Sequence, residues 1–268
     1  MSAAVEEPAA IHRRVAVVYN PIKVDEDVFR RLVSAKAAEH GFAEPTFYRT
    51  TLADAGEGVT RLDLARLRPG HGYHFLHRAD LIALLLTGAE AAGVKLRLLS
   101  CVSEVDLSGP APAVQLDSGE RVDSPLVIGA DGLHSKTRAA LNGVETPFFT
   151  RQVAWRAVIP CEPGAAPVAE VHMGPGRHLV SYPLRGGSLR NIVAVEERDR
   201  WAEESWTLRD DAITLRVAFA GFSPRVRGWL DRVEDPWLWG LFRHQVAGVW
   251  VKPMGQGGVA ILGDAAHP

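Results

Sequence analysis

The sequence predicts a mixed fold of the α/β or α+β class, and two patterns indicate it. Near the N-terminus, and again before residue 150, short apolar strand patterns alternate with helical patterns, which is typical of parallel βαβ units. Between 151 and 200, β-rich segments follow one another through Gly/Pro turns, as in an antiparallel sheet. The chain has 268 residues, of which 47% are hydrophobic, so one large or two modest domains fit.

Composition narrows the function classes. The formal net charge is -2 and the 30 basic residues are dispersed, so no nucleic-acid partner is expected. The longest aliphatic run, LIALLL at 81–86, is too short for a membrane span, and the N-terminus has no apolar signal region. Cys101 and Cys161 are too few for a disulfide framework. We therefore expect a cytoplasmic protein without a membrane partner, and the sequence assigns no oligomeric state.

Residues 1–60 predict a first βαβ segment. A strand at 15–19 ends at an Asn-Pro pair, apolar residues at near-helical spacing follow over 25–41, and a second strand covers 46–51. The charged, glycine-containing connector at 52–72 is the candidate boundary between this segment and the rest of the chain.

Residues 61–150 predict a second α/β segment. It opens with a strongly apolar helix, continues through strands and a hairpin turning on Asp-Ser-Gly, and ends with a buried strand that enters a glycine turn and a helix. The expected elements are a helix at 77–94, strands at 95–100 and 102–107, a hairpin at 114–123, a strand at 126–132 and a helix at 135–141.

Residues 151–250 predict an antiparallel sheet followed by a helical, tryptophan-rich region over 201–245. Residues 251–268 predict a return strand to the preceding segment. Four of the seven tryptophans fall in 229–250, and we interpret them as core and surface anchors rather than as a cofactor site. The expected sheet strands are 153–160, 169–174, 178–184 and 191–197.

Two stretches in which a strand runs into a loop contain the candidate ligand-binding residues. GADG at 129–132 places Asp131 and Gly132 between a buried strand and a helix start, where backbone N–H groups can meet a phosphate and Arg138 can add charge. The alternative is an ordinary strand–turn–helix with an N-capping aspartate. GDAAHP at 263–268 places Asp264 where its carboxylate can accept hydrogen bonds from sugar-like hydroxyls, with two alanines that permit close approach of a ligand. Its alternative is a structural cap.

Arg78, in the stretch HRADL, opens the helix at 77–94. A cation at a helix N-terminus is disfavoured by the helix dipole, so Arg78 is expected to have another partner, a ligand or a surface carboxylate. The histidines do not fall into metal-ligand spacing, so no metal site is expected.

Together HRADL, GADGLHSKTR and GDAAHP resemble the class A FAD-dependent aromatic hydroxylases, the para-hydroxybenzoate hydroxylase fold, over about 61–268. The resemblance implies a partial FAD/NAD(P)-binding three-layer domain with an inserted antiparallel substrate-covering sheet. It implies FAD as cofactor, NADH or NADPH as co-substrate and a small aromatic substrate. The flavin would carry the chemistry, so no catalytic side chain is assigned. The implied cofactor-binding residues are Arg78, Val102, Asp131, Gly132, Asp264 and Pro268, with a core role as the alternative for Val102.

The sequence departs from this family pattern at both ends. GxGxxG, which in the family cradles the FAD pyrophosphate, occurs nowhere in the chain, and no long helix follows GDAAHP. Residues 14–60 instead resemble the start of diacylglycerol-kinase-like lipid kinases, without that family's GGDGT loop.

Three functional hypotheses follow. The first is an FAD-dependent monooxygenase, incomplete relative to its family, that uses NAD(P)H and O2 to hydroxylate a small aromatic or polyketide-like compound. The second is a non-catalytic, truncated or fused flavoprotein remnant with weak or no flavin binding. The third, a lipid kinase, rests on residues 14–60 alone. The sequence leaves open whether this chain is an active enzyme.

Overall fold

The structure is a computed structural model that describes residues 16–19, 25–39, 46–49, 74–199, 207–255 and 257–268. The chain divides into two compact units. The first contains residues 1–77, 153–198 and 205–239, and the second contains residues 78–152, 199–204 and 240–268. The connector at 52–72, expected from the sequence to be a boundary between segments, lies outside the described residues.

The first unit begins with the βαβ segment that the sequence predicts. Strand β1 (Ala16–Tyr19) pairs in parallel with β2 (Thr46–Arg49), and α1 (Glu26–Glu39) lies between them in the chain. The Asp25 carboxylate accepts a hydrogen bond from the Val28 backbone N–H at 3.0 Å, which satisfies one of the free donors at the start of α1.

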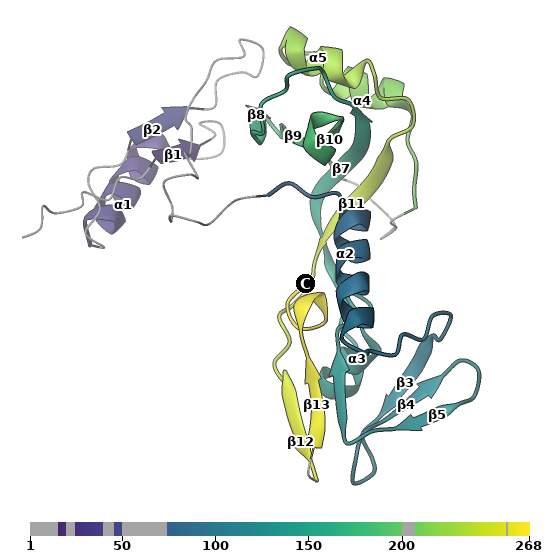
Figure 1. Ribbon diagram of the computed structural model, residues 1–268. Coiled ribbons are helices and arrows are strands. Elements are labelled where there is room, and N and C mark those ends of the chain that lie inside the picture. The colour runs from purple at the N-terminus through teal and green to yellow at the C-terminus, as the bar shows by residue number, and fades with distance from the viewer. Residues whose placement is uncertain (1–15, 20–24, 40–45, 50–73, 200–206, 256) are drawn as a thin grey trace, which may run out of the picture. The chain divides into compact units, whose positions relative to one another are not determined.

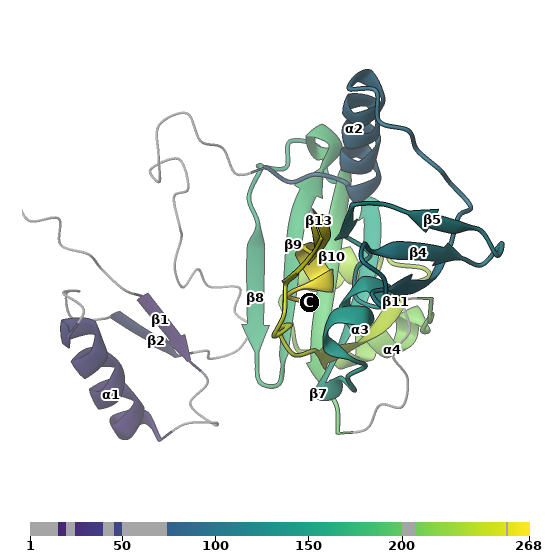
Figure 2. The same cartoon turned by 90° about the horizontal axis from the view of Figure 1, so that it is seen from below.

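A five-stranded sheet dominates the rest of the first unit. Figure 2 shows β8 at its edge, with β9 and β10 beside it. The neighbours β8, β9 and β10 run antiparallel, which confirms the meander expected from the Gly/Pro turns. In the order of the sheet, the strands are β11 (Trp237–Arg243), β7 (Phe148–Pro160), β10 (Leu189–Glu197), β9 (Arg177–Leu184) and β8 (Glu170–Gly174).

Two short helices, α4 (Ala212–Ala218) and α5 (Pro224–Leu230), lie on one face of this sheet (Figure 1). Trp155 of β7 meets Phe219, just after α4, with ring centroids 6.1 Å apart. On α5, Trp229 lies 4.4 Å from the Arg190 guanidinium of β10. Both contacts bury large aromatic rings, so these helices form the core side of the sheet.

The expectation of helix throughout 201–245 was wrong at its end. The segment Trp237–Arg243 is strand β11, because the neighbouring strand β7 is available as its partner in the sheet. Trp229 is buried, whereas Trp250 is 41% exposed, so the tryptophans include both core and surface anchors.

In the second unit, α2 (Arg78–Ala91) precedes a small antiparallel sheet of β3 (Val102–Asp106), β4 (Ala113–Leu116) and β5 (Arg121–Asp123). Residues 95–100, expected as a strand, form none. Leu99 there has a φ of 54° and a fully exposed side chain, so the apolar run in this stretch has no sheet to join.

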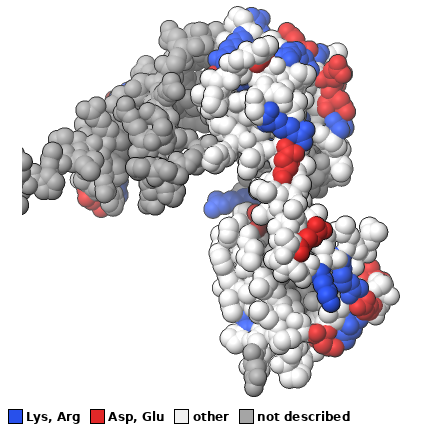
Figure 3. Space-filling model, viewed as in Figure 1, with Lys and Arg blue, Asp and Glu red and all other residues white. Residues whose placement is uncertain are grey.

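Charged side chains of both signs intersperse on the described surface seen in Figure 3. Around the small sheet they form exposed pairs, with Arg97 2.7 Å from Glu120 and Arg121 2.8 Å from Asp106. No helix in the described ranges combines the length and apolar character needed to span a bilayer, although α2 exposes several leucines.

The remaining sheet of the second unit positions the candidate site. Its order is β12 (Val251–Met254), β13 (Gly257–Ile261) and β6 (Leu126–Gly129). Strands β13 and β6 are parallel, as the predicted return strand requires. Helix α3 (Lys136–Asn142) follows β6 and contacts β6 and β3.

Candidate functional site

Strands β6 and β13 end side by side, and this shared edge defines the candidate site. Gly129 is the register partner of Ile261, and the Leu262 N–H donates to the Gly129 carbonyl at 3.0 Å. The loops that follow are GADG and GDAAHP. Two motifs more than 130 residues apart in the chain therefore meet at one sheet edge, where ligands of open parallel sheets bind.

Asp131 shapes the turn into α3. Its carboxylate accepts hydrogen bonds from the Ser135 hydroxyl at 2.6 Å and from the Thr137 N–H and hydroxyl, both at 3.1 Å. Ser135 is the N-cap residue of α3 and accepts the Arg138 N–H at 2.8 Å. Gly132 has a φ of 77°, so the turn uses the left-handed conformation that glycine adopts readily. Asp131 thus orders the loop from within the protein.

These contacts change the acidity of Asp131. Partial burial of the carboxylate opposes ionisation, but the hydrogen bonds from Ser135 and Thr137 outweigh it and hold the pKa below its ordinary value of 3.8. A carboxyl group whose pKa is lowered by folding stabilises the protein above its unfolded pKa. That stabilisation is lost as the pH falls through the folded-state pKa.

Asp131→Asn is therefore expected to lower the free energy of unfolding by a constant amount at neutral pH. The difference from wild type should shrink as the pH falls below 3.8. Urea unfolding at a series of pH values measures it. Glu104→Gln is the matched control, because Glu104 is exposed and its carboxylate makes no hydrogen bond or ion pair among the described residues. A difference that stays constant down to acid pH would contradict the prediction.

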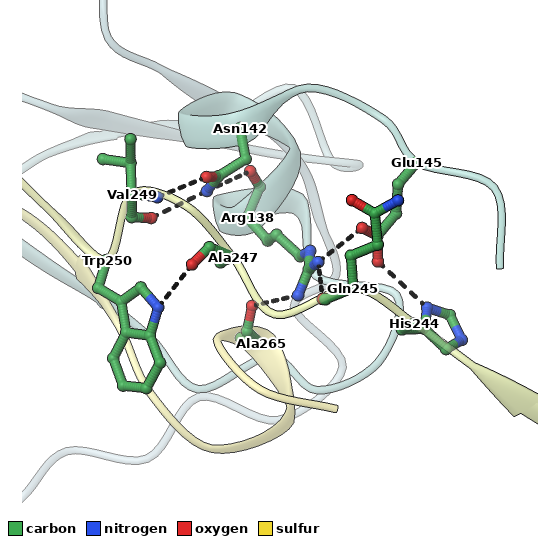
Figure 4. Close-up of polar contacts among 9 residues, drawn as sticks. All are labelled: Arg138, Asn142, Glu145, His244, Gln245, Ala247, Val249, Trp250 and Ala265. Atoms are coloured by element: carbon green, nitrogen blue, oxygen red, sulfur yellow. Dashed lines mark hydrogen bonds and ion pairs between the residues drawn. The ribbon is translucent and has the colours of Figure 1, made fainter.

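Arg138 joins the two loops from inside the protein. Its side chain is 7% exposed, and its guanidinium donates to the carbonyl of Ala265 at 3.4 Å and to the carbonyl of Gln245, as Figure 4 shows. The Glu145 carboxylate lies 2.7 Å from the same guanidinium. The expectation that Arg138 adds charge for a bound phosphate was wrong, because burial directs its charge to these internal partners. Arg138 instead holds the GDAAHP loop.

A second set of contacts fixes the segment that precedes β12. The Asn142 side chain accepts the Val249 N–H at 2.7 Å and donates to the Val249 carbonyl at 2.9 Å. Trp250 donates from its indole N–H to the Ala247 carbonyl at 2.8 Å (Figure 4). The C-terminal end of α3 is thereby tied to the segment that Arg138 also contacts.

The two alanines of GDAAHP are core residues. Ala265 and Ala266 are fully buried and pack with Ala247 and Ile261. The Ala247 N–H also donates to the Ala266 carbonyl at 2.8 Å. From the sequence, we expected these alanines to leave room for a ligand near the backbone. In the structure, their methyl groups face the protein interior instead. Small side chains are needed here because the two loops lie close together.

Unlike Ala265 and Ala266, Asp264 is exposed. Its carboxylate makes no hydrogen bond or ion pair with any residue that the structure describes. Pro268 is also exposed, and His267 stacks on Trp250 with ring centroids 5.4 Å apart. An unpaired carboxylate on a loop fixed by buried contacts fits a ligand rich in hydroxyl groups, such as the ribityl chain of a flavin.

Arg78 and Val102 lie elsewhere in the second unit. Arg78 is the first residue of α2 and is exposed, and it makes no hydrogen bond or ion pair among the described residues. Val102 opens β3 and pairs with Leu116. The structure thus brings together Asp131, Gly132 and Asp264 at the sheet edge, and the cofactor-binding roles of these three residues, like those of Arg78, Val102 and Pro268, stay predictions.

Comparison with known proteins explains this arrangement. The family described as FAD binding domain matches residues 27–268. The chain belongs to this family. The match begins inside the segment that we compared with lipid kinases, and the kinase resemblance is not borne out.

Relatives within the family are FAD-dependent aromatic monooxygenases. An FAD-dependent monooxygenase of Arthrinium sp. is 32% identical over 80% of this chain and 52% of its own length. The 6-hydroxynicotinate 3-monooxygenase of Bordetella bronchiseptica is 27% identical over 90% of this chain and 63% of its own length. The chain thus spans about half to two thirds of the length of these relatives.

Solved structures share the fold. A salicylate hydroxylase substrate complex aligns with a TM-score of 0.59 at 23% identity, covering 71% of this chain and 51% of that one. CtdE in complex with FAD and a substrate aligns with a TM-score of 0.64 at 22% identity, covering 76% and 53%. These similarities confirm the mixed α/β fold expected from the sequence.

Proposed function

We propose that this chain forms part of an FAD-dependent aromatic monooxygenase and contributes its flavin-binding edge and its substrate sheet. The observation that carries this proposal is the GDAAHP loop. Buried contacts from Arg138 and Ala247 fix the loop, while the Asp264 carboxylate remains exposed and unpaired among the described residues. A carboxylate held this way is preorganised to accept hydrogen bonds from ligand hydroxyls.

In this proposal Asp264 accepts hydrogen bonds from the flavin's ribityl chain, and Asp131 with Gly132 keeps the neighbouring turn open. Arg78 supplies charge to the phosphate–ribose region, the Val102 backbone meets the adenine end, and Pro268 lies beside the ring system. A bound flavin, reduced by NADH or NADPH, supplies the oxygen chemistry that no side chain provides. The domain boundaries expected from the sequence, 61–150 and 251–268 for the flavin and 151–250 for the substrate, are part of this proposal.

The substrate is proposed to be a small aromatic compound. Relatives include enzymes named for 6-hydroxynicotinate, 6-methylsalicylate and 3-hydroxybenzoate. In this chain, the sheet face opposite α4 and α5 carries an aromatic pair, with Phe75 stacked on Tyr182 at 5.0 Å. An aromatic surface of this kind favours a planar ring as its ligand.

A second candidate is a non-catalytic flavoprotein domain with weak or no flavin affinity. The observation that favours it is the lack of GxGxxG anywhere in the sequence. In dinucleotide-binding folds those glycines let the backbone approach the pyrophosphate. Without them, the ADP half of FAD loses its main anionic contact, so affinity would rest on the GDAAHP and GADG loops.

Titration of the full chain with FAD, followed by flavin fluorescence, separates these candidates. We expect saturable binding that weakens about 10- to 100-fold in Asp264→Ala, as loss of hydrogen bonds to a charged acceptor predicts. Glu104→Gln removes an exposed carboxylate of the same unit and should leave the affinity unchanged. Absence of binding by the wild type would support the non-catalytic domain. Binding that is equal in Asp264→Ala would place the flavin elsewhere.

A further inference from the structure

Asn191 is the third residue of β10, and it lies on the side of the sheet that α4 and α5 do not cover. Its neighbour Arg190 points toward α5. The Arg190 guanidinium lies over the Trp229 ring and donates a hydrogen bond to the hydroxyl of Ser181 on β9 at 2.7 Å. Side chains alternate along a strand, so Asn191 points to the opposite face. Its register partner is Tyr182, which carries the stacked Phe75.

Asn191 is 9% exposed, and its buried Nδ2 has no hydrogen-bond partner among the residues that the structure describes. A carboxamide N–H left unpaired in a protein interior is costly, and native proteins rarely leave one without a ligand or water. The missing partner must be a hydrogen-bond acceptor, because an amide Nδ2 only donates.

The surroundings of Asn191 indicate the chemistry of that acceptor. The next register pair on the same face is Val193 with Val180, so a half-buried apolar patch adjoins the amide. On the neighbouring strand β7, Arg156 follows Trp155, which faces α4, and Arg156 therefore shares the face of Asn191. Its guanidinium lies 4.5 Å from the Trp239 ring. The face thus combines an aromatic and apolar surface with a positive charge and a free amide donor.

We propose that Asn191 is a specificity-determining residue of the substrate face, donating a hydrogen bond from Nδ2 to the carboxylate of an aromatic ligand whose ring lies on Val180 and Val193. The inference rests on the proposed function, because it places the substrate on this sheet. It adds the side chain that recognises a carboxylate on that aromatic substrate.

Isothermal titration of the full chain with benzoate and with phenol tests this role. Phenol has the ring without the carboxylate. Asn191→Leu removes the donor and is expected to weaken benzoate binding about tenfold and phenol binding less than twofold. Asn191→Asp keeps the shape but places a negative charge on the face, so benzoate binding should weaken further while the cation benzamidine binds more tightly.

Ile192→Val is the matched control. Ile192 is the fully buried next residue of β10, on the opposite face, so this variant loosens the same strand without changing the face of Asn191. It should leave benzoate affinity unchanged. Thermal unfolding without ligand provides a second readout. Asn191→Leu should keep or raise the melting temperature because it removes an unpaired polar group, whereas a purely structural asparagine would lower it.

Equal benzoate affinity in wild type and Asn191→Leu would overturn the inference, as would parallel losses of benzoate and phenol binding with a lowered melting temperature. Failure of the wild type to bind benzoate while it binds FAD would overturn this inference and leave the flavin proposal standing. Benzoate binding that depends on Asn191 in a chain that does not bind FAD would support the substrate face and reject the flavin proposal.

Discussion

Arg138→Met is expected to lower the free energy of unfolding by about 3 kcal/mol, because it removes the buried guanidinium that pairs with the Glu145 carboxylate and leaves that carboxylate with the His244 imidazole, 3.4 Å away. Glu145 is 25% exposed in its side chain, which places the cost at the low end for buried ion pairs. The variant also removes the donors to the Ala265 and Gln245 carbonyls. Urea unfolding followed by circular dichroism measures the loss.

The double variant Arg138→Met/Glu145→Gln separates the two contributions. It removes both charges, so it should recover part of the stability lost in Arg138→Met. The control is Arg97→Met, which breaks the exposed pair with Glu120 and should cost less than about 1 kcal/mol. If Arg138→Met cost no more than Arg97→Met, Arg138 would not be the internal tie between the loops. If it is that tie, FAD affinity should also fall in Arg138→Met, because the GDAAHP loop loses its buried support.

Gly129→Ala is the second substitution that we expect to lower the free energy of unfolding substantially. A Cβ atom at Gly129 would overlap the Thr137 Cβ and would lie 2.5 Å from the Thr137 hydroxyl oxygen and 2.7 Å from its Cγ2. Helix α3 must therefore move away from β6 to admit one methyl group. Overpacking of this kind typically costs about 1–3 kcal/mol. We expect a loss in that range, together with displacement of the hydroxyl that donates to Asp131, and urea unfolding measures it.

The matched control for Gly129→Ala is Gly88→Ala. Gly88 lies in α2, and a Cβ atom there would meet no other atom within 4 Å. Alanine favours helix, so stability should stay equal or rise by up to about 1 kcal/mol. Both variants add one methyl group, and only one of them adds it against a neighbour. Unfolding midpoints that agree between the two variants would show that α3 does not pack on Gly129 as the structure has it.

Local patterns predicted most elements of the two units. Apolar alternation and Gly/Pro turns fix strands such as β9 and β10, because burial of one face depends on the sequence period alone. The wrong predictions of strand and helix arose where the assignment of an apolar segment depended on a partner strand. Residues 95–100 form no strand, and Trp237–Arg243 forms one beside β7. No local pattern states whether a partner strand is available, so tertiary context decided both segments.

The candidate site was likewise predicted in part from the sequence and decided in part by the tertiary structure. Its two motifs and the residues Asp131, Gly132 and Asp264 are visible in the sequence, because a strand running into a glycine turn marks the edge of a sheet. The roles of Arg138, Ala265 and Ala266 were assigned to a ligand and belong instead to the protein interior. A sequence does not show which way a side chain at a helix start points, whereas the proximity of the two loops fixes it.

By itself, the sequence determined the fold class, the order of most elements and the family to which the chain belongs, since these depend on periodicity and on short contiguous motifs. The tertiary structure alone decided which charges are internal, which carboxylate is free among the described residues and which amide lacks a partner there. The physical reason is that burial and hydrogen bonding are properties of residues distant in the chain. Asp264 and Asn191 acquire their proposed roles only after Arg138, Tyr182 and their other neighbours are placed around them.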